Sequence, residues 1–258
     1  MSLKRKRKCV STSLIRANVS LLKTLPNSTH YELTFFKKED LPVVLDFLNE
    51  KGATFGIHAP FVFRYQAVHP NPSSLSTELR KETYEKNEQC CKLAKEIGAE
   101  YVVIHFPNAK QTENWLKDKN ILKEAIEHVR NLSNYCQVRI ENVYYNEYFH
   151  NAKDYRWFLE QTGTTLCLDL GHLLLDSERY GFSTVEFVDV VEEYISEVHL
   201  YYADSKVYEK CHHAPWGCSA EFKILLERIR SLNCDFTLEA SNDCQEGLEK
   251  LIAFWEGL

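Results

Sequence analysis

A closed barrel of parallel strands, each followed by a helix, is the fold class that this sequence predicts. Short apolar runs alternate with helical patterns along the whole chain of 258 residues. Nearly continuous apolar strands that alternate with helices indicate a parallel sheet covered by helices. Eight such runs can be recognised, and one barrel of this kind has about 250 residues. We therefore predict a single domain over residues 1–258, a (β/α)8 TIM barrel.

The expected strands lie at residues 8–14, 31–36, 53–58, 100–105, 135–141, 164–169, 194–200 and 233–239. Between them, apolar residues recur three or four positions apart, as at 40–52 and 83–98, which indicates helices. Gly52 and Gly98 stand just ahead of a strand, where the C-cap of a helix belongs. A last helix, from about residue 244, closes the ring.

An open, doubly wound sheet is the competing architecture. Such a sheet typically carries a glycine-rich phosphate loop after its first strand. The corresponding residues 11–20 contain no glycine. Functional side chains at the ends of six strands also suit a barrel better, so the closed barrel is favoured.

The composition is that of an ordinary globular protein, with 44% hydrophobic and 26% charged residues. A net charge of −6 argues against a general polyanion binder. The basic residues 1–7 start like a signal peptide, but the apolar core that should follow is missing. We interpret them as a solvated lead-in to the first strand. No stretch approaches the roughly 18 consecutive apolar residues that a membrane span needs.

The nine cysteines show no regular spacing, and Cys136, Cys167 and Cys234 lie inside apolar runs. An odd number of cysteines in such positions indicates reduced, buried thiols and not a disulfide framework. The sequence therefore predicts a cytoplasmic protein.

Six apolar runs each end on or next to a side chain that can bind a metal. These residues are His58, His105, Glu141, Asp169, His199 and Glu239. In a parallel barrel the carboxyl ends of the strands converge on one mouth. Three carboxylates and three imidazoles at one point would repel one another or stay desolvated unless a cation lay among them. This pattern predicts a metal enzyme.

Simpler interpretations exist for single members of this set. A lone histidine at a strand end is more often a core residue bonded to a backbone carbonyl, but His58 and His105 occupy equivalent places on successive strands. Asp169 could instead cap the next helix. In the unit CLDLGH, we expect Gly171 to allow a sharp turn that points His172 back toward the mouth.

Two further features depend on context. Arg139 could pair with Glu141, although strand geometry places the two at different depths of the barrel. The segment CHHAPWG carries Cys211 and His213 directly after the strand of His199. Cysteine and histidine both bind zinc, although this is not the spacing of a paired structural zinc site.

The chain resembles the xylose isomerase-like barrel superfamily, which includes endonuclease IV and metal-dependent sugar isomerases and epimerases. The resemblance runs from about residue 30 to the end. It is carried, in order, by GIHAP, EYVVIH, RIEN, CLDLGH, EVHL, HHAPWG and TLEA.

Resemblance to the sugar isomerases and epimerases implies one metal, held by Glu141, Asp169, His199 and Glu239. The catalytic residues would then be Glu141 and Glu239, on opposite faces of the sugar. One removes a proton next to the carbonyl and the other returns it, while the metal polarises the substrate oxygens. His172 would form a hydrogen bond to the substrate.

Resemblance to endonuclease IV implies three zinc ions. His58, His105 and Glu141 would take one, and Glu141 would bridge to a second that is held by Asp169, His199 and Glu239. His172 and His213 would serve the third, where Cys211 replaces the aspartate of that family.

The DNA-directed alternative is disfavoured by the loops and the charge. The loop after the second strand offers only Lys37 and Lys38 where that family contacts DNA, and DNA binding gains most of its affinity from phosphate neutralisation. We therefore favour a small carbohydrate-like substrate such as a sugar, sugar phosphate or polyol. A barrel that only binds a metal or ligand is the third alternative.

The cofactor that both resemblances imply is a divalent metal, zinc or manganese, with one to three ions per chain. Aromatic and basic residues of the loops at the mouth are the candidates for substrate contact. They are Phe61, Arg64, Tyr201 and Trp216.

Overall fold

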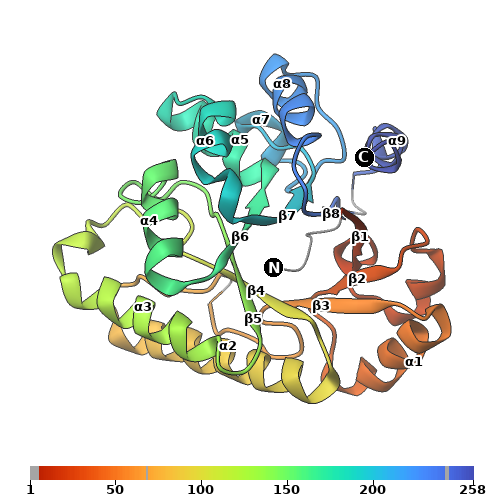
Figure 1. Ribbon diagram of the computed structural model, residues 1–258, viewed down its shortest axis with the longest axis horizontal. Helices are drawn as coiled ribbons and strands as arrows, with labels where there is room; N and C mark the ends of the chain where they lie inside the picture. Colours follow the sequence, from red (N-terminus) through yellow and green to blue (C-terminus); the bar gives the residue numbers. More distant parts are fainter. Residues whose placement is uncertain (1–5, 68, 242–243) are drawn as a thin grey trace.

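The computed structural model describes residues 6–67, 69–241 and 244–258, and within them eight strands form one closed parallel barrel (Figure 1). Each strand pairs with the next along the chain, and the first also pairs with the last. The strands are β1 Arg7–Ser11, β2 His30–Leu33, β3 Thr54–His58, β4 Tyr101–His105, β5 Gln137–Glu141, β6 Thr165–Asp169, β7 Ile195–Leu200 and β8 Asp235–Leu238. The predicted barrel is confirmed, with all eight strands within a few residues of the expected ranges.

Helices surround the strands on the outside (Figure 1). They are α1 Leu41–Lys51, α2 Thr77–Ile97, α3 Lys119–Leu132, α4 Ala152–Thr162, α5 Leu170–Tyr180, α6 Thr184–Val191, α7 Ser205–Tyr208, α8 Ala220–Ile229 and α9 Leu248–Glu256. Gly52 and Gly98 follow α1 and α2 with φ of 59° and 82°, which confirms their prediction as C-caps. Across the described segments, no helix combines the length and the apolar character that a membrane crossing requires.

The first connection departs from the regular pattern. The strand expected at 8–14 stops at Ser11, because the side chain of Ser11 caps a 3-10 helix over Thr12–Ile15. Arg16 and Ala17 then adopt left-handed backbone conformations with φ of 48° and 51°, which end that helix. A second 3-10 helix follows in place of an α-helix between β1 and β2.

A buried ionic layer fills the barrel below its mouth. The Arg139 guanidinium lies over the ring of Tyr101, with its central carbon 3.4 Å from the ring centroid. It pairs with Glu197 at 2.7 Å and with Asp235 at 2.9 Å. Arg139 therefore pairs below the mouth and not with Glu141, because alternate strand residues lie at different depths.

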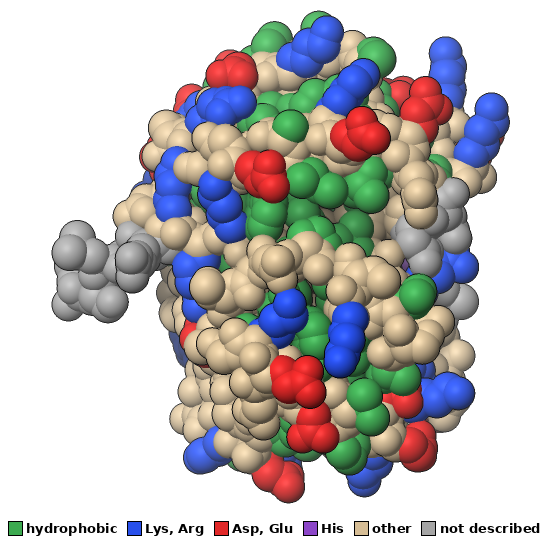
Figure 2. Space-filling model, turned by 90° about the vertical axis from the view of Figure 1, so that its right-hand side faces the viewer, with side chains coloured by type: hydrophobic (Ala, Val, Ile, Leu, Met, Phe, Trp, Pro, Cys, Tyr) green, Lys and Arg blue, Asp and Glu red, His purple; other side chains and the backbone are tan. Residues whose placement is uncertain are grey.

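The N-terminal boundary also differs from the prediction. Arg7 begins β1, and its guanidinium pairs with Asp235 at 2.7 Å, so it is not part of a solvated lead-in. Residues 1–5 of that stretch lie outside the described residues. On the side of the molecule in Figure 2, basic and acidic side chains are interspersed with hydrophobic ones over the described surface.

Candidate metal centre at the barrel mouth

Strand register brings the six potential ligands together at one end of the barrel. His58, His105, Glu141 and Asp169 end their strands, His199 is next to last in β7, and Glu239 directly follows β8. His105 pairs with Glu141, and Asp169 with His199, across neighbouring strands. Four groups of donor atoms among the described residues lie within 4.8 Å of one another, and two of them consist only of the predicted strand-end ligands. The first is His58, His105 and Glu141, and the second is Glu141, Asp169 and His199, to which Glu239 adds through its contact with His199.

Glu141 joins the two sets. Its Oε2 lies 2.6 Å from Nε2 of His58 and 3.1 Å from Nε2 of His105. Nδ1 of His58 donates to the carbonyl of Ala59 at 3.1 Å. In the neutral ring, Nε2 therefore presents a lone pair to a carboxylate oxygen, and a proton or a metal must lie between them.

The electrostatics of this pair reflect its burial. Burial opposes ionisation of Glu141, but the charges of His105 and His58 hold its pKa well below the ordinary value. Burial likewise opposes the charged form of His58, but Glu141 raises the pKa of His58 to about 10. In the metal-free protein, the pair is therefore an imidazolium and a carboxylate at neutral pH.

The second set contains buried atoms with no hydrogen bond. His199 Nδ1 lies 2.7 Å from Glu239 Oε2 and 3.9 Å from Asp169 Oδ2, yet none of these three atoms has a hydrogen-bond partner. Burial and the nearby Glu141 and Glu239 raise the pKa of Asp169 well above its ordinary value. A cation among these atoms would compensate them all, so the donor set fits a divalent metal.

Asp169 serves two purposes at once. Its Oδ1 accepts a hydrogen bond of 2.7 Å from the backbone of His172, so it caps α5 as the simpler interpretation held. Its Oδ2 is left free and buried at the metal cluster. The two interpretations of Asp169 are therefore compatible.

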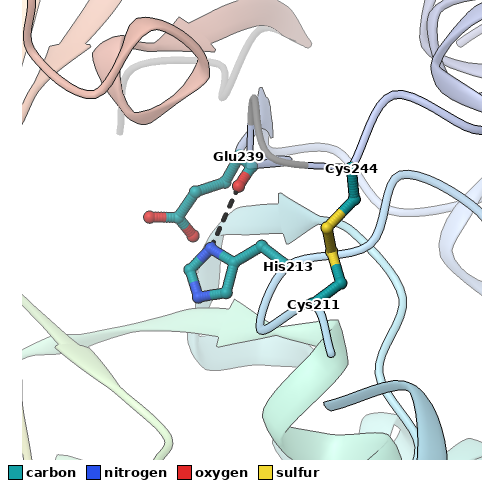
Figure 3. The surroundings of a disulfide bond; sticks show 4 residues. All are labelled: Cys211, His213, Glu239 and Cys244. Carbon is teal, nitrogen blue, oxygen red and sulfur yellow. Dashed lines mark hydrogen bonds between the residues drawn. A yellow bond between two sulfur atoms is a disulfide. The ribbon is translucent and has the colours of Figure 1, made fainter. Parts of the chain in front are cut away.

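His172 and His213 each use one ring nitrogen to fix the ring. Nδ1 of His172 donates to the carbonyl of Asn142 at 2.8 Å, and Nδ1 of His213 donates to the carbonyl of Glu239 at 3.1 Å (Figure 3). Burial lowers the pKa of His172 to about 4, so the ring is neutral. The lone pair on Nε2 of the neutral His172 ring remains for a metal or a substrate, and the contact through Nδ1 leaves Nε2 of His213 for the same purpose.

The role that we expected for Gly171 is wrong. Gly171 lies in the first turn of α5, and its φ is not positive. A Cβ at this position would lie 2.0 Å from the ring of Tyr201. Glycine is therefore required by the close packing of Tyr201 against α5, and not by a sharp turn. The Tyr201 ring in turn stacks on His213, with centroids 4.1 Å apart.

Cys211 forms a disulfide with Cys244 (Figure 3), so the prediction that all cysteines are reduced is wrong for these two residues. The bond joins the loop after β7 to the loop after β8. The Cα atoms of the two cysteines lie 6.2 Å apart, because the neighbouring strands β7 and β8 bring these loops together. In this state Cys211 offers no thiolate as a zinc ligand. The other seven cysteines are not in disulfide bonds.

A cavity of about 490 Å³ opens over the cluster. From the ligand candidates it is lined by His58, His105, Glu141, His172, His213 and Glu239, and from the surrounding loops by residues that include Arg64, His69, Tyr144, Tyr208 and His212. A larger cavity of about 880 Å³ lies elsewhere, around Trp216 and the disulfide. The smaller cavity is the candidate active site because the candidate metal ligands line it.

The structure places the four residues that were expected to contact substrate in different environments. Arg64 lines the cavity, but its guanidinium donates to the carbonyls of four phenylalanines, including Phe36 at 3.0 Å, so it fixes two loops. Phe61 and Tyr201 are fully buried. Trp216 lines the larger cavity. The sequence could not show these placements, because loop conformation decides them.

Two residues of the site were missed. His69 is a loop histidine that follows no predicted strand, yet it lines the cavity, and burial lowers its pKa to about 4. Glu32 on β2 is fully buried, and its Oε1 lies 3.2 Å from Nε2 of His199. A carboxylate inside the apolar run HYEL was the available signal for Glu32.

Sequence comparison agrees with this geometry. The family model of the xylose isomerase-like TIM barrel matches residues 30–256. The chain therefore belongs to the xylose isomerase-like TIM barrel family. No curated protein matches it.

Solved structures with the same fold include sugar epimerases and a dehydratase. A D-tagatose 3-epimerase-like protein is 18% identical, with a TM-score of 0.69 and 97% of each chain covered. A D-allulose 3-epimerase from Methylomonas sp., in complex with D-allulose, is 11% identical, with a TM-score of 0.69 and 98% of this chain and 90% of that chain covered. The probable 3-DHS dehydratase AsbF from Bacillus anthracis is 14% identical, with a TM-score of 0.64 and 97% of each chain covered. At these identities the likeness establishes the fold.

Proposed function

We propose that the protein is a divalent-metal-dependent isomerase or epimerase that acts on a sugar, a sugar phosphate or a polyol. The observation that carries this proposal is the position of two buried glutamates. Glu141 and Glu239 line the same cavity at the mouth of the barrel, and Asp169 and His199 complete a set of donors beside them. A proton donor and acceptor pair next to a metal set suits proton transfer at a carbon beside a carbonyl.

The residues of this chain would divide the work as follows. Glu141 and Glu239 act as the two catalytic bases, one removing the proton and the other returning it. The opposing charges of nearby histidines hold the pKa of both below the ordinary value, even though burial opposes ionisation, so both start as carboxylates. His172, with Nδ1 fixed by Asn142, offers Nε2 to a substrate hydroxyl. A bound metal would supply charge to polarise the substrate oxygens.

The size and walls of the cavity support a small substrate. A volume of about 490 Å³ lies within the range of small-molecule sites, ~300–1,000 Å³. Tyr144 and Tyr208 on its wall provide apolar faces for a sugar ring, and His69 and His212 provide polar contacts. The epimerases with the same fold, one with D-allulose bound, support a carbohydrate-like substrate.

Zinc and manganese are the metals that we propose, because imidazole ligands favour zinc and carboxylates suit manganese. Metal content of the purified, unchelated protein, measured by elemental mass spectrometry, tests the centre directly. One ion per chain supports the epimerase, whereas no ion even after reconstitution contradicts the proposal.

The reaction is tested with a panel of ketoses in deuterium oxide. An epimerase or isomerase that works by proton transfer incorporates solvent deuterium at the carbon next to the carbonyl. Glu239→Gln is the matched control, since it keeps the shape of the side chain and removes its basicity. Turnover without deuterium incorporation in any substrate would contradict the proposed mechanism.

A zinc phosphodiesterase that acts on abasic DNA is the second candidate. It is favoured by the convergence of His58 and His105 on Glu141, which offers a second donor set. It is disfavoured by Cys211, which is in a disulfide where the related nucleases have an aspartate ligand. Two or three zinc ions per chain together with cleavage of abasic DNA would favour this candidate, and a protein inactive in both assays would be a metal-binding barrel.

A further inference from the structure

A buried carboxylate lies on the far side of His199 from the proposed metal set. Glu32 is fully buried in the barrel interior, on β2. Its Oε1 lies 3.2 Å and its Oε2 3.4 Å from Nε2 of His199. Neither resemblance to known families pointed to a residue on this strand.

The environment of Glu32 differs from that of Glu197, another buried carboxylate beside His199. Glu197 accepts hydrogen bonds from Arg139 at 2.7 Å, from Tyr101 at 3.0 Å and from Thr237. Glu32 Oε1 has no hydrogen-bond partner, and the Oε2 of Glu32 faces His199. Glu197 is therefore compensated by the layer below, whereas the contact with His199 is the feature that explains a carboxylate at position 32.

The two ring nitrogens of His199 face different carboxylates. Nδ1 faces Glu239 at 2.7 Å and Asp169 at 3.9 Å, whereas Nε2 faces Glu32 at 3.2 Å and, farther away, Glu197 at 3.8 Å. An imidazole nitrogen binds a metal only when it carries no proton. If Nε2–H donates to Glu32, the neutral ring leaves Nδ1 bare, toward the metal set.

We infer that Glu32 is a positioning residue that fixes the tautomer and the orientation of His199 for metal binding. The inference rests on the metal centre proposed above. Carboxylates that accept the second N–H of a metal-binding histidine orient the ring and increase its basicity. Glu32 acts through His199 and does not touch the metal or the substrate.

Direct metal binding by Glu32 is the competing arrangement, since donor atoms of Glu32, His58, His199 and Glu239 lie within 4.8 Å of one another. The positions of the two nitrogens argue against it. One imidazole cannot direct both nitrogens to a single ion. A metal on the Nδ1 side, with Glu239 and Asp169, leaves Glu32 beside the opposite nitrogen.

The experiment is a cobalt titration of wild type, Glu32→Gln and Glu32→Asp, with affinity from chelator competition and geometry from the visible absorption of bound cobalt. We expect Glu32→Gln to weaken cobalt binding by about 10–100-fold with an unchanged spectrum, and Glu32→Asp to restore part of the loss. Asp176→Asn is the matched control: Asp176 is also a buried carboxylate, but it accepts a hydrogen bond from the backbone of Tyr145. Its cobalt affinity should stay near wild type.

A second measurement follows the contact between Nε2 and Glu32 in metal-free protein with nitrogen-15-labelled histidine. Both ring nitrogens of His199 face carboxylates in that state, so we expect both to be protonated in wild type. Long-range proton–nitrogen correlation, with His199→Gln for assignment, should show a shifted Nε2–H signal in Glu32→Gln. Unchanged affinity and an unchanged Nε2–H signal would overturn the inference, and so would a changed cobalt spectrum with a far larger loss, because this indicates a lost ligand. If wild type binds no metal, the proposed function fails, while the Nε2–H signal still tests Glu32.

Discussion

Nε2 of His58 lies 2.6 Å from Oε2 of Glu141, and this contact pairs a charged imidazole with a carboxylate at the barrel mouth of the metal-free protein. Both side chains are almost fully buried. Nδ1 of His58 is occupied by a backbone carbonyl, so the contact requires a proton or a metal on Nε2. The same atoms thus form an ion pair without metal and are the proposed ligands of a bound metal.

Removal of either proposed catalytic carboxylate is expected to abolish turnover without unfolding the protein. Glu141→Gln and Glu239→Gln keep the size of the side chains but cannot accept the proton. A positioned base contributes about 10²–10⁴-fold to the rate, so kcat should fall by at least that range. Circular dichroism should show that both variants are folded, with a lower thermal transition for Glu141→Gln because its carboxylate stabilises the charged form of His58. Full activity in either variant would contradict the mechanism.

Stability of the metal-free protein is expected to depend on pH through His58. Burial opposes its charged form, but Glu141 raises the pKa of His58 from 6.5 to about 10 on folding. The resulting stabilisation is fully present below pH 6.5 and is lost as the pH rises through 10. The pKa of Glu141 is lowered, so its contribution is present above the unfolded value of 4.5 and is lost in acid.

Urea unfolding of the chelated protein checks this pH dependence. Between pH 6.5 and 10 the free energy of unfolding should fall by up to about 1.4 kcal/mol per pH unit for this one group. His58→Gln should have a smaller slope over the same range, since the titrating group is gone. Equal slopes in wild type and variant would show that other groups cause the alkaline loss. Bound metal, which replaces the proton, should reduce the slope in wild type.

Much of the site was predictable because strand-end position is a sequence property. His105 and Glu141 end strands that pair in register, and alternating apolar runs reveal such ends. Glu32 escaped the same reasoning because the expected strand, 31–36, placed it near the strand start, whereas β2 spans His30–Leu33 and ends one residue after Glu32. The feature that draws attention to Glu32 is its contact with His199, which lies more than 160 residues away along the chain.

Loop conformation was the part that the sequence could not predict. Phe61 looked like a mouth residue, but a left-handed backbone conformation with φ of 55° turns the chain and buries its ring against Phe36. Gly171 was expected to allow a sharp turn, but the ring of Tyr201, from the end of another strand, occupies the space where a Cβ would lie. Both outcomes depend on contacts between segments far apart in sequence.

Gly171→Ala is expected to disturb the site through Tyr201. The added Cβ would lie 2.0 Å from the ring, so either Tyr201 or α5 must move. Overpacking of this kind costs about 1–3 kcal/mol. Because α5 carries His172 and Tyr201 stacks on His213, metal affinity should fall together with stability.

Gly257→Ala is the control for this substitution. Gly257 has an ordinary helical conformation, and the nearest atoms to an added Cβ are 3.4 Å away. Its melting temperature and metal affinity should match wild type. If Gly171→Ala were equally neutral in a calorimetric melt and a metal titration, the close packing would not constrain the site.

The disulfide gives a prediction that does not depend on the function. Thiol titration in denaturant should count seven free cysteines without reductant and nine with it. The bond closes a loop between residues 33 apart, so its reduction should lower the free energy of unfolding by about 2–4 kcal/mol. Cys211→Ser should reproduce this loss, and Cys218→Ser, which removes an exposed thiol in the same loop, should not.

Reduction should also loosen His213, which is close to Cys211 in sequence and is bonded to the carbonyl of Glu239 (Figure 3). Nine reactive thiols without reductant would show that the bond is absent in solution.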